Sequence, residues 1–136
     1  MHEESLLEKF TLAAHSAEFG IEFSLSNDGR YVVFADQTKM FGDILVEADG
    51  EELIVTYGRF THSHFACYRE DIGRMERRAS VVDNVIETLR LVFSGEIAFY
   101  GSHAGGGGCG RRELLDQHAN SRCNTEIIYW PKKIFS

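Results

Sequence analysis

Two short glycine turns, each between segments of alternating apolar residues, constrain the fold of this chain most strongly. Glycine takes the positive φ that tight hairpin turns require. Alternation of apolar and polar residues has the period of a half-buried strand. The sequence therefore predicts two successive hairpins, which form an antiparallel meander of four strands. The turns are Asn27–Gly29, between Ile21–Leu25 and Tyr31–Ala35, and Asp49-Gly50, between Ile44–Ala48 and Leu53–Phe60.

Helical signals lie on both sides of the meander. Ser5 and Glu8 have the spacing of a capping box, and Gly20 is a natural stop, so a helix is expected over residues 4–19. Between residues 72 and 93, apolar residues recur at alternating spacings of three and four, which predicts a long amphipathic helix. Ser80 could begin a new helix, so a break near it stays open.

The remaining segments add one or two strands. Residues 96–100 read as a short strand, a glycine run follows, residues 112–118 favour a helical turn, and residues 125–130 read as a last strand. The predicted fold class is α+β: a mainly antiparallel sheet of five to six strands, with an N-terminal helix and a long amphipathic helix packed on it. A length of 136 residues indicates a single domain, 1–136.

Charge and cysteine usage narrow the classes of partner and compartment. The net charge of −7 repels nucleic acid and anionic membranes, and it suits a basic protein partner. Three cysteines, an odd number, indicate reduced thiols and a cytoplasmic protein. The N-terminus has no apolar signal-peptide region, and no apolar run has the length of a membrane span. A homodimer through an exposed sheet edge is a further expectation.

The most unusual motif is the segment Tyr57–Phe65, which places His62 and His64 at a spacing of two, at the end of the fourth predicted strand. Residues at that spacing share one face of a strand, and two imidazoles with a third ligand can hold zinc. The spacings between these two histidines and the other histidines and cysteines that could be further ligands match no zinc signature, so we assign no metal ligand and expect no cofactor. A strand end with local hydrogen bonds is the simpler interpretation. Those further ligands are His103, Cys109, His118 and Cys123.

A metal-dependent or histidine-assisted enzyme is the alternative to a binding protein. Thr61 stands beside the two histidines, and Cys67 or Cys109 could act as a nucleophile with one of them. No nucleophile elbow surrounds either cysteine. The candidate site consists of Thr61, His62, His64, His103 and Cys109.

The glycine run suggests a third kind of site. Backbone amides of Gly106, Gly107 and Gly108 could cradle an anion beside Arg111 and Arg112. A phosphate loop, however, needs a lysine followed by serine or threonine, and arginines stand in those places. A flexible loop without a ligand is the simpler expectation.

The motif Thr61-His62-Ser63-His64-Phe65 and the glycines of residues 105–108 together resemble small uncharacterised bacterial proteins. Some of these look like immunity proteins of polymorphic-toxin systems. The resemblance implies a protein-binding or inhibitory role and no particular chemistry. We therefore expect a small cytoplasmic binding factor with a basic protein as its partner.

Overall fold

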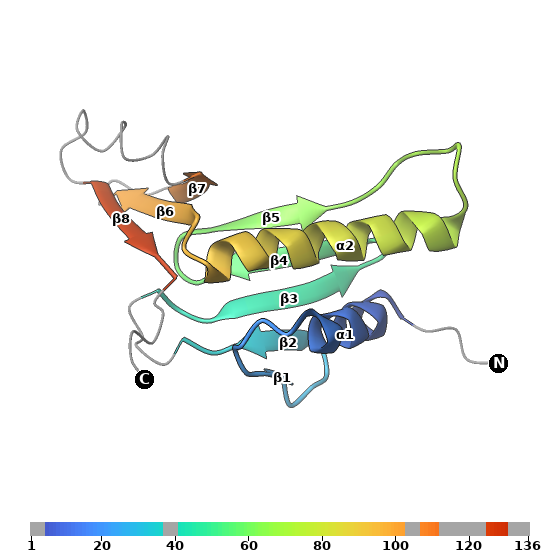
Figure 1. Cartoon of the computed structure of the whole chain (residues 1–136), viewed down its shortest axis with the longest axis horizontal. Coiled ribbons are helices and arrows are strands. Elements are labelled where there is room, and N and C mark those ends of the chain that lie inside the picture. Colours follow the sequence, from blue (N-terminus) through green and yellow to red (C-terminus); the bar gives the residue numbers. More distant parts are fainter. Residues whose placement is uncertain (1–4, 37–40, 103–106, 112–124, 131–136) are drawn as a thin grey trace.

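The structure, a computed structural model, describes residues 5–36, 41–102, 107–111 and 125–130. In these ranges the chain forms two helices and eight strands (Figure 1). They are α1 (Leu6–Ala17), β1 (Phe23–Leu25), β2 (Tyr31–Phe34), β3 (Ile44–Asp49), β4 (Glu52–Tyr57), β5 (Thr61–Phe65), α2 (Arg74–Phe93), β6 (Ile97–Ser102), β7 (Gly107–Arg111) and β8 (Thr125–Tyr129).

Helix α1 begins at the predicted cap. The backbone N–H of Glu8 donates to the Ser5 hydroxyl oxygen at 3.1 Å, which satisfies one of the donors that a helix start leaves free. The helix ends where Glu18 takes the left-handed conformation, with φ of 51°. Its buried side chains are spaced along one face: Leu6, Phe10, Ala14 and Ala17.

Strands β1 to β5 form a five-stranded antiparallel sheet in chain order. Both predicted turns are confirmed. Asp28 closes the first turn by accepting hydrogen bonds from the Ser26 hydroxyl at 2.6 Å and from the Arg30 backbone N–H at 3.1 Å. In the second turn, Asp49 pairs with Glu52 across Gly50, whose φ is +62°.

The fourth predicted strand is in fact two strands. Strand β4 ends at Tyr57, the chain turns at Gly58 with φ of +53°, and β5 returns beside β4. The Phe60 N–H donates to the Tyr57 carbonyl at 3.0 Å and closes this turn. The prediction that His62 and His64 end the fourth strand is therefore wrong, because both lie within a fifth strand.

Gly58 is required at this turn because the backbone of another segment touches it. A Cβ atom at position 58 would lie 2.0 Å from the Phe41 carbonyl oxygen. That carbonyl accepts a hydrogen bond from the Arg59 N–H at 3.2 Å, and the Gly58 N–H donates to the Asp43 carbonyl at 3.1 Å. No side chain fits between these two backbone segments, and positive φ is costly for any residue with a Cβ.

A buried carboxylate holds Phe41 in place for this contact. Asp36 is 5% exposed, and its Oδ2 accepts hydrogen bonds from the N–H groups of Phe41 at 2.7 Å and Gly42 at 2.8 Å. The Asp36 N–H donates in turn to the Asp43 carboxylate at 2.9 Å. Hydrogen bonds from several N–H groups compensate the cost of burying a carboxylate.

Helix α2 runs without a break through Ser80, so the possible break does not occur. Its buried residues begin at Val81, whereas Met75, at the start of the predicted apolar stripe, is 72% exposed. Only the second half of the helix is therefore packed in the core. Within the described residues, no helix is long and apolar enough to cross a membrane.

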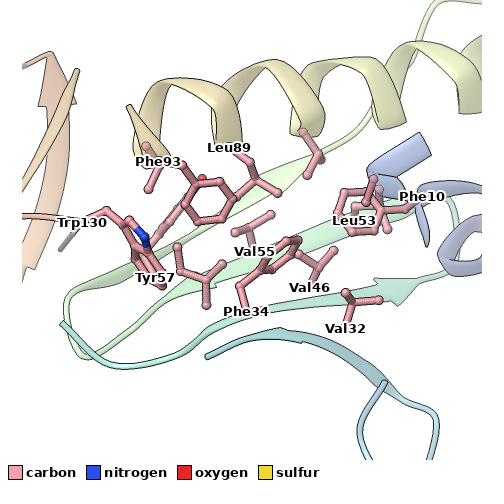
Figure 2. Close-up of a cluster of buried hydrophobic side chains, with 14 of the residues drawn as sticks. Phe10, Val32, Phe34, Val46, Leu53, Val55, Tyr57, Leu89, Phe93 and Trp130 are labelled. Carbon is pink, nitrogen blue, oxygen red and sulfur yellow. The ribbon is translucent and has the colours of Figure 1, made fainter. Parts of the chain in front are cut away.

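Both helices lie on the same face of the five-stranded sheet (Figure 1). Phe10 of α1 and Leu89 and Phe93 of α2 meet alternate side chains of the strands beneath them (Figure 2). Each fully buried side chain of this size contributes about 1.5–3 kcal/mol of transfer free energy. The strand residues on this core face are Val32, Phe34, Ile44, Val46, Leu53, Val55 and Tyr57.

The last three strands form a second sheet, in the order β7-β6-β8, instead of extending the first. The described second half of the glycine run is a strand and not a loop, because Gly107–Arg111 pairs along β6. Aromatic rings join this sheet to the core: Phe41 lies 4.7 Å from Phe99 and 5.3 Å from Trp130, measured between ring centroids. The α+β class is confirmed.

The contact at Gly58 predicts a large difference between two glycine substitutions. Gly58→Ala should lower the free energy of unfolding by at least about 3 kcal/mol, because it adds a backbone clash to the cost of positive φ. Urea unfolding followed by circular dichroism measures this loss.

Gly50→Ala is the matched control, since Gly50 also has positive φ but a Cβ there would meet no atom within 4 Å. It should cost only about 1–2 kcal/mol. Equal losses for the two variants would show that the contact with Phe41 does not matter.

Candidate functional site: the open face of the five-stranded sheet

The five-stranded sheet has a second face, opposite the helices, which we call the open face. The register places two rows of side chains across it. One row runs through Val33, Leu45, Thr56 and His62, and the other through Tyr31, Glu47, Ile54 and His64. Because the side-chain period of a strand is two, all eight residues point away from the core face.

The open face carries more apolar surface than a solvated sheet face needs. Val33, Leu45 and Ile54 lie on its central strands and are half-buried, with Tyr31 beside them. Antiparallel sheets with one wet face usually alternate apolar and polar residues, whereas strands covered on both faces are apolar throughout. The run Leu53-Ile54-Val55 in β4 has the second pattern. The helices nevertheless lie on the other face (Figure 1).

Charged groups around these apolar residues are mainly acidic. Glu47, Asp49 and Glu52 share the open face by register. Arg30 lies beside them, with its Nε 3.6 Å from Glu47 Oε2 and its guanidinium 5.6 Å from the centre of the Tyr31 ring. Three carboxylates and one guanidinium leave this face with an excess of negative charge.

The two histidines form a pair at the β5 edge of the open face. Their ring centroids are 5.3 Å apart, and the ring planes are inclined at 65°. Both residues are exposed. His64 Nδ1 lies 3.7 Å from Glu52 Oε1, which is longer than a hydrogen bond but close enough for attraction to a protonated ring.

The structure separates Thr61 from the two histidines. Thr61 pairs with Tyr57 and lies on the core face, while His62 and His64 lie on the open face. The hydroxyl and the imidazoles therefore do not form one catalytic group. The alternation of the strand already implied this separation, because residues one apart point to opposite faces. Cys67 follows β5, is half-buried and packs against the hydrophobic core.

The other candidate residues are described only in part. His103, Gly106 and Arg112 lie outside the described residues, as do His118 and Cys123. Gly107, Gly108, Cys109 and Arg111 belong to β7, whose backbone pairs with β6 and which contacts β5. The strand containing Cys109 thus lies next to the strand containing the histidines. Among the described residues, no group of three or more His, Cys, Asp or Glu side chains could hold a metal ion.

Three arginines at the start of α2, Arg74, Arg77 and Arg78, make contacts within the fold. Arg74 donates to Glu51 Oε1 at 2.8 Å, and Arg78 donates to Glu51 Oε2 at 2.9 Å. Arg77 donates to the Ile72 carbonyl at 2.6 Å. The two contacts with Glu51 attach the exposed half of α2 to the β3–β4 turn. The hydrogen bonds from Arg78 and then Arg74 lower the pKa of Glu51 to about 2.

The residues of the open face were not among the site residues predicted from the sequence. The available signal was an apolar residue in the second phase of the alternation in each of β2, β3 and β4, namely Val33, Leu45 and Ile54. The sequence analysis placed the candidate site at the histidines and the glycine run instead, because these motifs are more unusual. The residues that were missed are Tyr31, Val33, Leu45, Glu47, Glu52 and Ile54.

Comparisons with family models, with curated proteins and with solved structures find no match to this chain. The resemblance to immunity-type proteins therefore stays a prediction. The function has to be inferred from the surface that the described residues form.

The pKa of Glu51 predicts how the stability of the protein depends on pH. The folded value of about 2 lies below the ordinary value of 4.5, so the stabilisation is present above about pH 4.5 and is lost as the pH falls towards 2. Because the Glu51 side chain is 53% exposed, the contribution should be about 1 kcal/mol or less. Glu51→Gln should remove it, as measured by urea unfolding at a series of pH values.

Glu87→Gln, on the exposed side of α2, is the control and should change stability little at any pH. The difference between wild type and Glu51→Gln should be largest near neutral pH and should approach zero near pH 2. A difference that stays constant across this range would contradict the assignment.

Proposed function

We propose that this protein is a protein-binding factor of the immunity type, which holds a basic protein against the open face of its five-stranded sheet. The observation that carries the proposal is that Tyr31, Val33, Leu45 and Ile54 lie near one another on the face of the sheet that α1 and α2 do not cover (Figure 1). A partner protein would cover the second face.

The size of the open face indicates what kind of complex to expect. Five strands of three to six residues span at most roughly 20 Å by 20 Å, or about 400 Å² in projection. A standard protein–protein interface buries about 800 Å² on each partner. The partner must therefore also contact the rim of the sheet, where the carboxylates and the histidine pair lie.

The acidic rim favours a basic partner. Glu47, Asp49 and Glu52 lie beside the apolar residues, toward the β3–β4 turn end of the open face, and the whole chain carries a net charge of −7. Complementary charge raises the rate of association and disfavours acidic competitors more than it raises affinity. Burial of Leu45 and Ile54 would then supply hydrophobic free energy at about 25 cal/mol per Å².

A broad sheet face suits a protein better than the other classes of ligand. Small molecules bind in concave sites that cover most of their surface. Nucleic acid would meet carboxylates where it needs cations. Immunity proteins act by binding and inhibiting a toxin, and the resemblance of the Thr61–Phe65 motif also supports this form of the proposal.

The test uses the most basic proteins encoded by the genes that adjoin the gene for this chain. We expect one of them to form a complex with the purified protein, and co-expression to protect cells from its toxicity. The double variant Glu47→Lys/Glu52→Lys should weaken binding at least tenfold and reduce its dependence on salt concentration, as measured by surface plasmon resonance.

Asp83→Lys/Glu87→Lys is the matched control, since it makes the same change in net charge on the exposed side of α2. It should leave binding within about twofold of wild type. The proposal fails if no adjoining gene product binds, or if both double variants weaken binding equally.

A further inference from the structure

The geometry points to a transition-metal chelate formed by His62 and His64 on β5. The two residues stand two positions apart in the strand, so both imidazoles lie on the open face. The Cα pairs Thr56↔His62 and Ile54↔His64 attach this part of β5 to β4. Hydrogen bonding between the strands therefore fixes the backbone under both rings.

The distance between the two rings suits one shared ion. In a tetrahedral site with Zn–N bonds of about 2.0–2.1 Å, the centroids of two imidazole ligands lie roughly 5 Å apart. The centroids of His62 and His64 are 5.3 Å apart. The rings therefore lie at a spacing that one ion could bridge.

The neighbourhood of the pair favours a cation. Glu52 Oε1 lies 3.7 Å from His64 Nδ1, so a carboxylate stands beside one of the rings. Its negative charge attracts a cation to the pair. Both histidines are exposed, so water can reach an ion held between them.

The ligand types select the class of metal. Imidazole is a good ligand for Zn²⁺, Ni²⁺ and Cu²⁺, whereas Mg²⁺ and Ca²⁺ require oxygen ligands. Two imidazoles supply half of a tetrahedral coordination shell, and water would complete it. The described residues supply no third metal-binding side chain at the pair. The sequence analysis assigned no metal ligand, and the chelate is proposed from the geometry of the two rings.

The chelate does not depend on the proposed function. It needs only the two imidazoles on β5, whereas partner binding uses the apolar centre and the acidic rim of the open face. The two sites share Glu52 and the histidine pair, but the metal titration needs no partner protein and the binding assay needs no metal, so the two tests can fail separately.

The test is isothermal titration calorimetry of the full-length protein, with Zn²⁺ alone and, separately, with Ni²⁺ alone. Wild type should bind one ion of either metal in the histidine pair. His62→Ala and His64→Ala should each weaken this binding at least tenfold, because removal even of an outer group that orients a ligand costs 10–100-fold. Nuclear magnetic resonance should show the ring signals of both histidines shifting in step with added Zn²⁺.

His15→Ala is the matched control, because His15 is an exposed histidine on α1. It should bind both metals as tightly as wild type. Since His62 and His64 are exposed, their alanine variants should unfold at nearly the same temperature as wild type. Unchanged metal affinity in these two variants, or ring signals that do not move with Zn²⁺, would overturn the inference.

Discussion

The contact between the backbones at Gly58 and Phe41 is the constraint on which the rest of the structure depends. The Asp36 carboxylate accepts a hydrogen bond from the Phe41 N–H, and the Phe41 carbonyl accepts one from the Arg59 N–H. This crossing forces the chain to reverse after β4, so that the next residues return as β5. The same crossing places the Phe41 ring among Phe60, Phe99 and Trp130, where the second sheet meets the core. One close backbone approach therefore sets both the strand that carries the histidines and the junction of the two sheets.

Local signals predicted the parts of the fold that depend on local contacts. The cap at Ser5, the turn at Asp49-Gly50 and the long helix all follow from residues within a few positions of one another. The turn at Gly58 was missed because Leu53–Phe60 read as one continuous strand, and the contact with Phe41 that requires glycine there involves a residue distant in the chain. Strand β7 was missed because glycines have low strand propensity, and only pairing with β6 makes Gly107–Arg111 extended.

The candidate site was predictable to a smaller extent. Spacing alone put His62 and His64 on one face of a strand, and the structure agrees. The same spacing put Thr61 on the opposite face, which the hypothesis of a hydroxyl–imidazole site overlooked. Val33, Leu45 and Ile54 become neighbours only through the register of three strands, and their exposure depends on which face the helices cover. No local sequence pattern specifies which face of the sheet the helices cover.

The position of Trp130 has a spectroscopic consequence. It is the one tryptophan of the chain, it is 5% exposed, and its ring lies 5.1 Å from Phe93 and 5.3 Å from Phe41. Its fluorescence therefore reports on the junction between the second sheet and the core. Separation of the sheets would admit water to the indole and shift its emission to longer wavelength. Far-ultraviolet circular dichroism, which is dominated by α1 and α2, would not change in that event, so the two signals distinguish loosening of the junction from unfolding of the whole protein.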